Sequence, residues 1–86
     1  PEEEACAAIL ADTLSVMGRK WAKMLQIEKH GRFQEAAKAA YGLDGRQIRK
    51  AVLQACASSK ELAMDPNELT VEELIVSLKH SKKVSA

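Results

Sequence analysis

The sequence has few aromatic residues and no long apolar run. Its 86 residues include one Trp, one Tyr and one Phe. There is no alternating run of β-branched residues of the kind that forms strands, and the apolar share comes largely from Ala and Leu, so the composition predicts an all-α fold. No apolar run approaches the roughly 20 residues that a membrane-spanning helix needs, and no charged and then apolar leader opens the chain. We therefore expect no membrane partner.

Charge of one sign and closely spaced cysteines are also lacking. The net charge is +1, which is too small to predict binding to nucleic acid or membranes from the overall field. Cys6 and Cys56 have no CxxC spacing and both fall on apolar helical stripes, which indicates buried, reduced thiols rather than a disulfide or a metal site. His30 has no partner at ligand spacing, so no metal site is predicted. Reduced thiols predict an intracellular protein, cytoplasmic or nuclear.

A chain of this length has room for one compact domain, residues 1–86, of modest stability. Its first residue is Pro1 rather than Met. We therefore expect this chain to be a piece of a longer polypeptide.

Apolar periodicity predicts four helices, which are long, short, medium and short in chain order. They cover residues 2–28, 32–41, 45–60 and the segment from 70 onward. The first carries a core stripe made of Cys6, Leu10, Leu14, Met17, Trp21, Met24 and Leu25. A second apolar line lies about a third of a turn away and consists of Ile9, Val16 and Ile27. Either a neighbouring helix covers this line or a further domain does.

The second helix has small residues and one tyrosine on its inner face. This face consists of Phe33, Ala36, Ala37, Ala40 and Tyr41. We place Tyr41 in the core with its hydroxyl at the surface. The alternative is that its ring lies against a bound base.

The most informative stretch is the turn that opens the third helix, Gly42-Leu43-Asp44-Gly45-Arg46. Gly42 suits a left-handed helix stop, and Gly45 allows close approach of another group. Asp44 is a good N-cap whose partner three residues later is Gln47. Arg46 needs explaining, because a cation in the first turn meets the positive end of the helix dipole at a cost of about 0.3–1 kcal/mol. A phosphate bound at this helix end would reverse the sign of that interaction.

The third helix separates apolar from charged residues. Its buried face is predicted to hold Ile48, Ala51, Val52, Ala55 and Cys56, and its other face Arg46, Arg49, Lys50 and Leu53. Residues 61–68 are expected to form a connector with Leu62 and Met64 tucked onto the core. Thr70 then caps the last helix, with Glu73 completing a capping box and Leu69 packing on Leu74.

The pattern Gly-Leu-Asp-Gly-Arg-x-Ile-Arg-x-Ala-Val over residues 42–52 resembles the second-sensor motif in the small helical lid of AAA+ ATPases. The resemblance extends over essentially the whole chain, because the flanking helices match the lid in number and order. It implies an all-α, four-helix lid-type bundle. Asp44 replaces a Ser that many members carry, and both are N-caps. The Arg at position 46 indicates Clp-type unfoldases or remodellers of HORMA-domain checkpoint proteins, because many members of the narrower AAA clade carry Ala there.

The resemblance also implies a site and partners. Arg46 would contact the β- and γ-phosphates of ATP bound with Mg²⁺ by the parent's own P-loop domain, and the turn would border the adenine. The expected nucleotide site comprises Gly42, Leu43, Asp44, Gly45, Arg46 and Arg49. Neighbouring subunits of a hexameric ring and an unknown protein substrate are the further partners implied. Because the chain has no Gly-x-x-x-x-Gly-Lys-Ser/Thr loop, it is not expected to hydrolyse ATP alone, although its parent would.

Two other functions are compatible with the residues. A helix-turn-helix DNA-binding domain would place Arg46, Gln47, Arg49 and Lys50 in the major groove. The low net charge disfavours this alternative, because phosphate contacts require cations. A third interpretation is a helical interaction module without a ligand.

Overall fold

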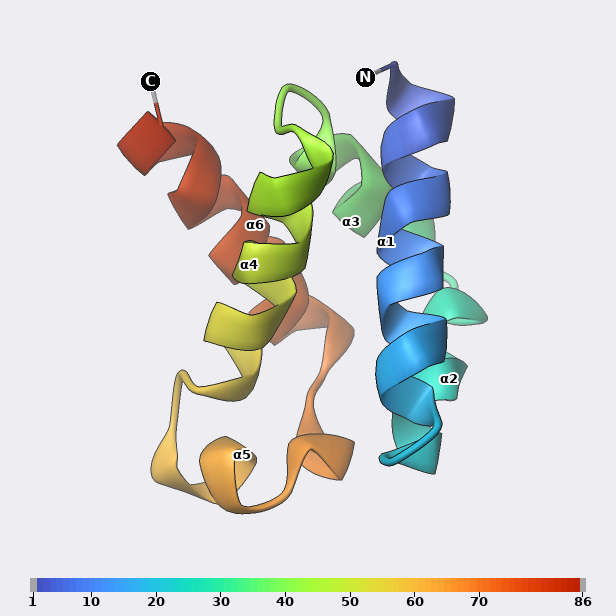
Figure 1. Cartoon of the computed structure of the whole chain (residues 1–86), viewed down its shortest axis with the longest axis vertical. Helices are drawn as coiled ribbons and strands as arrows, with labels where there is room; N and C mark the ends of the chain where they lie inside the picture. Colours follow the sequence, from blue (N-terminus) through green and yellow to red (C-terminus); the bar gives the residue numbers. More distant parts are fainter. Residues whose placement is uncertain (1, 86) are drawn as a thin grey trace.

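The computed structural model describes residues 2–85 and confirms the all-α class (Figure 1). Its elements are α1 (Glu3–Gly18), the 3-10 helix η1 (Ala22–Met24), α2 (Leu25–Glu28), α3 (Phe33–Ala40), α4 (Gly45–Cys56), α5 (Lys60–Met64), the 3-10 helix η2 (Pro66–Glu68) and α6 (Val71–Ser85). The four predicted helices correspond to α1, α3, α4 and α6, which form a helical bundle. The short elements η1, α2, α5 and η2 were not predicted as separate helices. The proposed extent of the domain, 1–86, stays a prediction, and Pro1 and Ala86 lie outside the described residues.

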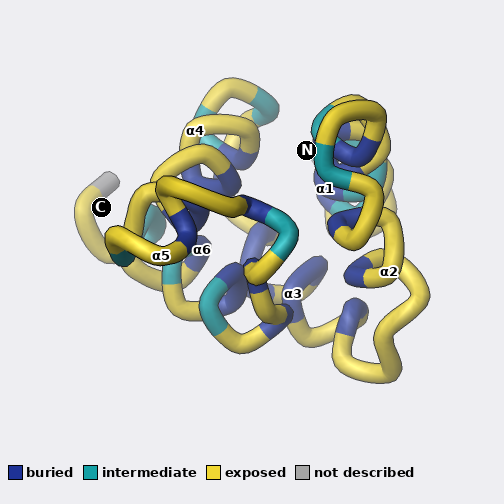
Figure 2. Tube along the Cα trace, turned by 90° about the horizontal axis from the view of Figure 1, so that it is seen from below, coloured by how far each residue is buried: buried dark blue, intermediate teal, exposed yellow. Residues whose placement is uncertain are grey.

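The bundle packs by contacts of α1 with α3 and α4, and of α6 with α3 and α4. Figure 1 shows α1 on one side and the α4–α6 pair on the other, with α5 at the far end from both chain termini. The fully buried large side chains come from α1, η1, the turn before α4, α4 and α6, and include Leu10, Leu14, Met24, Leu43, Ile48, Val52, Leu74 and Leu78. Figure 2 shows the buried positions on the inner sides of the helices. One apolar core therefore joins the start and the end of the chain.

The long first helix is shorter than predicted. It ends at Gly18, and the chain turns through residues 19–21 before η1 and α2. The turn brings Leu25 back onto the end of α1, where a Cβ built on Gly18 would lie 2.3 Å from a Leu25 methyl carbon. The glycine thus accommodates a leucine seven residues later. Leu25 is nevertheless 44% exposed, although the sequence placed it in the core, and Trp21 is half-buried.

Two other predicted core positions are also corrected. Tyr41 is 54% exposed because it is the C-cap of α3 and its extended backbone turns it off the inner face of that helix. Met64 is 78% exposed at the end of α5, whereas Leu62 is buried as predicted. The second apolar line of α1 is only partly covered within the described residues. Ile27 is buried within the bundle, while Val16 is 49% exposed.

The connector between α4 and α6 contains more helix than predicted. Ser59 caps α5 by accepting a hydrogen bond from the Leu62 N–H at 3.1 Å. Asp65 caps η2, and Asn67 within η2 accepts a hydrogen bond from the Lys23 N–H at 3.1 Å. This bond ties the connector to η1. Across residues 2–85, each helix is too short or too polar to cross a bilayer.

Candidate functional site

The turn before α4 has the geometry that the sequence predicts. Gly42 has a φ of 99°, the left-handed conformation that glycine adopts without strain. The Asp44 carboxylate accepts the Gln47 N–H at 2.8 Å, and the Gln47 side-chain oxygen accepts the Asp44 N–H at 2.9 Å. The capping box is therefore complete. It fixes the first residue of α4 and so the direction in which the side chains of its first turn leave the helix.

The two residues around Asp44 are packed against the bundle. Leu43 is 1% exposed. Its carbonyl oxygen accepts a long hydrogen bond from the Cys6 thiol, with 4.0 Å between oxygen and sulfur. At Gly45 a Cβ would lie 3.3 Å from a guanidinium nitrogen of Arg49 and 3.6 Å from a methyl of Ile9. The predicted close approach at Gly45 is therefore made by residues of this chain. The Leu43 side chain belongs to the core and offers no accessible contact.

The predicted arginines lie at the surface. Arg46 and Arg49 are exposed, as are Lys50 and Leu53 further along α4. Among the described residues, ion pairs form at Arg32, which bridges Glu35 and Glu72, and none forms at Arg46 or Arg49. The guanidinium of Arg46 is thus available to an anionic group from outside the chain. No structural feature holds it inside the bundle.

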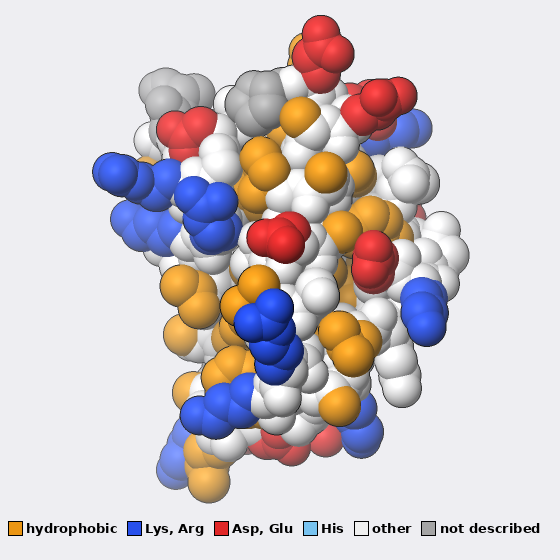
Figure 3. Space-filling view, turned by 45° about the vertical axis from the view of Figure 1, so that its right-hand side comes forward, with side chains coloured by type: hydrophobic (Ala, Val, Ile, Leu, Met, Phe, Trp, Pro, Cys, Tyr) orange, Lys and Arg blue, Asp and Glu red, His pale blue; other side chains and the backbone are white. Residues whose placement is uncertain are grey.

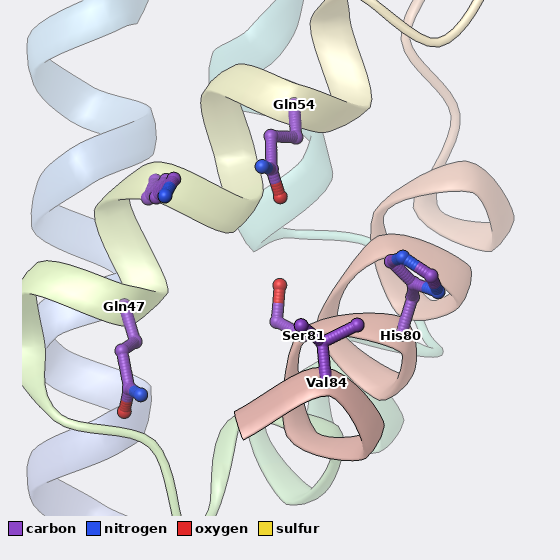
Figure 4. Close-up of a pocket in the computed structure, with 6 residues that line it drawn as sticks. Gln47, Gln54, His80, Ser81 and Val84 are labelled. Atoms are coloured by element: carbon purple, nitrogen blue, oxygen red, sulfur yellow. The ribbon is translucent and has the colours of Figure 1, made fainter.

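A groove that the sequence did not predict runs between α4 and α6. It consists of two adjoining hollows of about 180 Å³ and about 420 Å³. The first is lined by Gln47, Lys50, Gln54, His80, Ser81 and Val84. Figure 4 shows Gln54 and Ser81 pointing toward one another across it, with Val84 on the α6 side. Val76, His80 and Val84 share one face of α6 at intervals of four residues. That spacing, outside the buried stripe of α6, is the signal from which the groove could have been predicted.

The remaining described surface was compared with the arrangements that metals, reactive thiols and charged ligands require. Within residues 2–85, no group of three or more His, Cys, Asp and Glu side chains is arranged to hold a metal. Burial, and secondarily the charge of Glu73, raise the pKa of the Cys56 thiol, which disfavours the reactive thiolate. Figure 3, on the side where α1 comes forward, shows apolar, basic and acidic side chains interspersed without a field of one sign.

One curated relative matches nearly the whole chain. CD-NTase-associated protein 6 of Pseudomonas aeruginosa is 34% identical over 84 residues, which is 98% of this chain. The chain spans 28% of the length of that relative. No protein-family model matches the sequence. No solved structure matches it at a significant level.

This comparison overturns the AAA+ interpretation. The relative carries the name of a CD-NTase-associated protein and not that of an AAA+ ATPase, so the pattern at residues 42–52 does not establish a lid. The roles that depend on that family are withdrawn with it: sensing of the β- and γ-phosphates by Arg46, a parent that hydrolyses ATP, and contacts within a hexameric ring. The local geometry of the turn is unaffected by this correction.

The DNA-binding alternative is not supported either. It requires Gln47 to face the major groove, whereas the oxygen of that side chain is used in the capping box of α4. Nucleotide contact by Gly42, Leu43, Asp44, Gly45, Arg46 and Arg49 stays a prediction, as does the binding of ATP with Mg²⁺ by another domain.

Proposed function

We propose that these residues form a helical interaction domain of a protein that works with a CD-NTase, and that the domain binds a protein component of that system. The observation that carries the proposal is the 34% identity to CD-NTase-associated protein 6 over 98% of this chain. A match that runs across every helix indicates a shared unit rather than a shared motif. The name of the relative supplies the kind of partner, a CD-NTase.

The surface supports an interaction role. Among the residues that the structure describes, seven large apolar side chains are exposed, namely Val16, Leu25, Tyr41, Leu53, Met64, Val76 and Val84. Single exposed apolar residues are ordinary, but interfaces are built from apolar contacts surrounded by polar and charged groups. Val76 and Val84 lie on the same face of α6, and Leu53 lies beside the cations of α4. These positions offer apolar contacts with charge nearby.

The cations at the start of α4 fit the same function. Arg46 and Arg49 are three residues apart on the helix, so their side chains are neighbours. Both are exposed, and neither forms an ion pair with another described residue. Exposed charges at the edge of an interface act chiefly on the association rate, because they attract an oppositely charged partner before contact. In this proposal the two arginines attract an acidic surface of the partner.

Binding to the CD-NTase of the same organism tests the proposal. The full polypeptide that carries these residues, immobilised by a tag, is expected to bind the purified CD-NTase saturably in surface plasmon resonance. Arg46→Ala is expected to slow association severalfold, with the difference shrinking as salt is added, because exposed charges are screened. Arg19→Ala, at an exposed arginine just after α1, serves as the matched control. No saturable binding by the unmodified protein would overturn the proposal.

A further inference from the structure

The turn between α2 and α3 is exposed and contains one of the two histidines of the chain. Residues 28–32 are all exposed, and α3 begins directly after them with the buried Phe33. Arg32 is the N-cap of α3, and its own side chain makes no cap hydrogen bond. The first N–H groups of a helix have no partner within the helix, so they need acceptors from elsewhere. The turn is the segment that supplies them.

His30 supplies two of these acceptors. Its Nδ1 accepts the Arg32 N–H at 3.0 Å, and its carbonyl oxygen accepts the Phe33 N–H at 3.0 Å. The first bond joins a side chain to the main-chain N–H two residues later, which is the arrangement that Asn and Asp form in turns. In a neutral imidazole one ring nitrogen carries the proton and the other accepts. The geometry therefore places the proton of neutral His30 on Nε2.

The residue that His30 holds is a link to two helices. The Arg32 guanidinium pairs with Glu35 in the first turn of α3 and with Glu72 at the start of α6, the latter at 2.8 Å. α2, which precedes the turn, packs on α1 and η1. The position of the Arg32 backbone thus affects how the turn is connected to both α3 and α6.

Protonation of His30 removes its side-chain acceptor. Both ring nitrogens of an imidazolium are donors, so a protonated Nδ1 would face the Arg32 N–H with a second N–H. The new charge would also stand near the first turn of α3, where the positive end of the helix dipole disfavours a cation. Both effects oppose the closed turn and act in the same direction.

The charges around His30 do not offset an imidazolium. His30 lines a hollow of about 500 Å³ together with residues of η1, α2, η2 and α6. The other charged side chains that line it are Lys23 of η1, Arg32, and Glu72 of α6. Glu72, the one carboxylate among these described lining residues, is already paired with Arg32. Within the turn, Glu28 and Lys29 carry opposite charges.

We infer that His30 is a pH-sensitive latch for the turn formed by residues 28–32. With a neutral imidazole the latch is closed, because Nδ1 holds the Arg32 N–H at the start of α3. As the pH falls through the range in which histidine gains its proton, about pH 8 to 5, the bond is lost and the turn opens. The change is local, since the apolar core contains no group that titrates in this range. This inference is independent of what the domain binds.

Hydrogen exchange at two pH values tests the inference in the full polypeptide that carries these residues. Millisecond labelling read by mass spectrometry gives the protection of residues 28–33, relative to an unstructured peptide of the same sequence at the same pH. The protection is expected to fall about threefold or more between about pH 7.5 and about pH 5.5. Carboxylates with ordinary pKa values stay ionised across this window, so the ion pairs of Arg32 persist.

Three variants assign the change to one imidazole. His30→Asn is expected to keep wild-type protection at both pH values, because an Asn side chain accepts the same N–H and does not titrate. His30→Ala lacks the acceptor and is expected to be as weakly protected at about pH 7.5 as wild type is at about pH 5.5. His80→Asn, at the exposed histidine of α6, is expected to behave as wild type. Circular dichroism verifies folding of each variant.

Three results would each overturn the latch. The first is an equal pH dependence of protection in wild type and His30→Asn. The second is wild-type protection of His30→Ala at about pH 7.5, which would mean that the bond to Arg32 protects nothing. The third is loss of the pH dependence in His80→Asn, which would assign it to α6. Binding to the CD-NTase is not measured here, so the latch and the interaction domain can fail separately.

Discussion

The start of α4 and the end of α1 are built in opposite ways. α4 begins with a left-handed glycine and a complete capping box formed by Asp44 and Gln47. α1 has no side-chain cap at its first residue, and it ends where Leu25 packs on Gly18. Local hydrogen bonds specify the first boundary, and packing between separated residues specifies the second. We therefore expect the two boundaries to respond differently to substitution.

Truncation of a buried side chain is expected to give the largest difference in stability loss between the two regions. Ile48 of α4 is fully buried, so Ile48→Ala is expected to cost about 2–5 kcal/mol of unfolding free energy, because it removes apolar contacts and leaves a cavity. Ile27→Ala in α2 is expected to cost less, because a one-turn helix can relax around the smaller side chain. Urea unfolding followed by circular dichroism measures both. Equal losses would show that α2 is held as rigidly as α4.

The glycine of the turn before α4 gives the next effect. Gly42→Ala places a Cβ in the left-handed conformation and is expected to cost about 1–2 kcal/mol. Gly31 is the control, because a Cβ there would meet no atom within 4 Å. Gly31→Ala is expected to leave the urea midpoint unchanged or slightly higher. A similar loss at both glycines would contradict the special role of Gly42.

The capping residue of α4 is expected to have a comparable or smaller effect. Asp44→Ala removes the acceptor of the Gln47 N–H and should destabilise the domain by about 0.5–2 kcal/mol. Glu2 stands at the corresponding position of α1 and makes no side-chain cap. Glu2→Ala is therefore expected to leave the thermal midpoint nearly unchanged. A larger loss from Glu2→Ala than from Asp44→Ala would reverse the comparison.

The smallest effect concerns the ion pairs of Arg32, which connect the start of α3 to the start of α6. Its hydrogen bond to Glu35 lowers the pKa of that carboxyl below its ordinary value of 4.5. A lowered pKa in the folded state contributes stability above the ordinary value, and this contribution is lost as pH falls through the lowered pKa. Wild type is therefore expected to lose more stability than Glu35→Gln between about pH 5 and about pH 3.

Glu28→Gln, at an exposed glutamate outside this cluster, controls for acid effects that do not involve Arg32. It should follow the wild-type pH dependence in thermal unfolding. Parallel curves for wild type and Glu35→Gln would mean that the pair contributes nothing to stability.

The sequence predicted those parts of the fold that depend on neighbouring residues. Asp44 and Thr70 cap the helices they were expected to cap, and Gly42 takes the predicted conformation. The end of α1 was placed ten residues too late because periodicity alone cannot reveal that Leu25 folds back on Gly18. Tyr41 was misplaced for a related reason, since its position depends on where α3 ends rather than on the helical pattern.

The candidate site likewise combines features that the local sequence predicts with features that depend on tertiary packing. The exposure of Arg46, Arg49 and Lys50 followed from the helical pattern of α4. The spacing of Val76, His80 and Val84 indicates one wall of the groove, but that α4 supplies the other wall depends on how two distant helices pack. The predicted geometry at the start of the Gly42–Val52 pattern is confirmed. The function that was attached to this pattern did not follow from that geometry. A local arrangement can recur on proteins with different functions, so function has to be argued from the site.

The two buried cysteines allow the opening of α1 and of α4 to be measured over time. Cys6 is fully buried in α1, and Cys56 is 8% exposed at the end of α4. An alkylating reagent reaches either sulfur only when the surrounding helices open. Pulsed labelling of the native protein, read by peptide mass spectrometry, would therefore time the opening of each region separately. The chain thus carries one reporter thiol in α1 and one in α4.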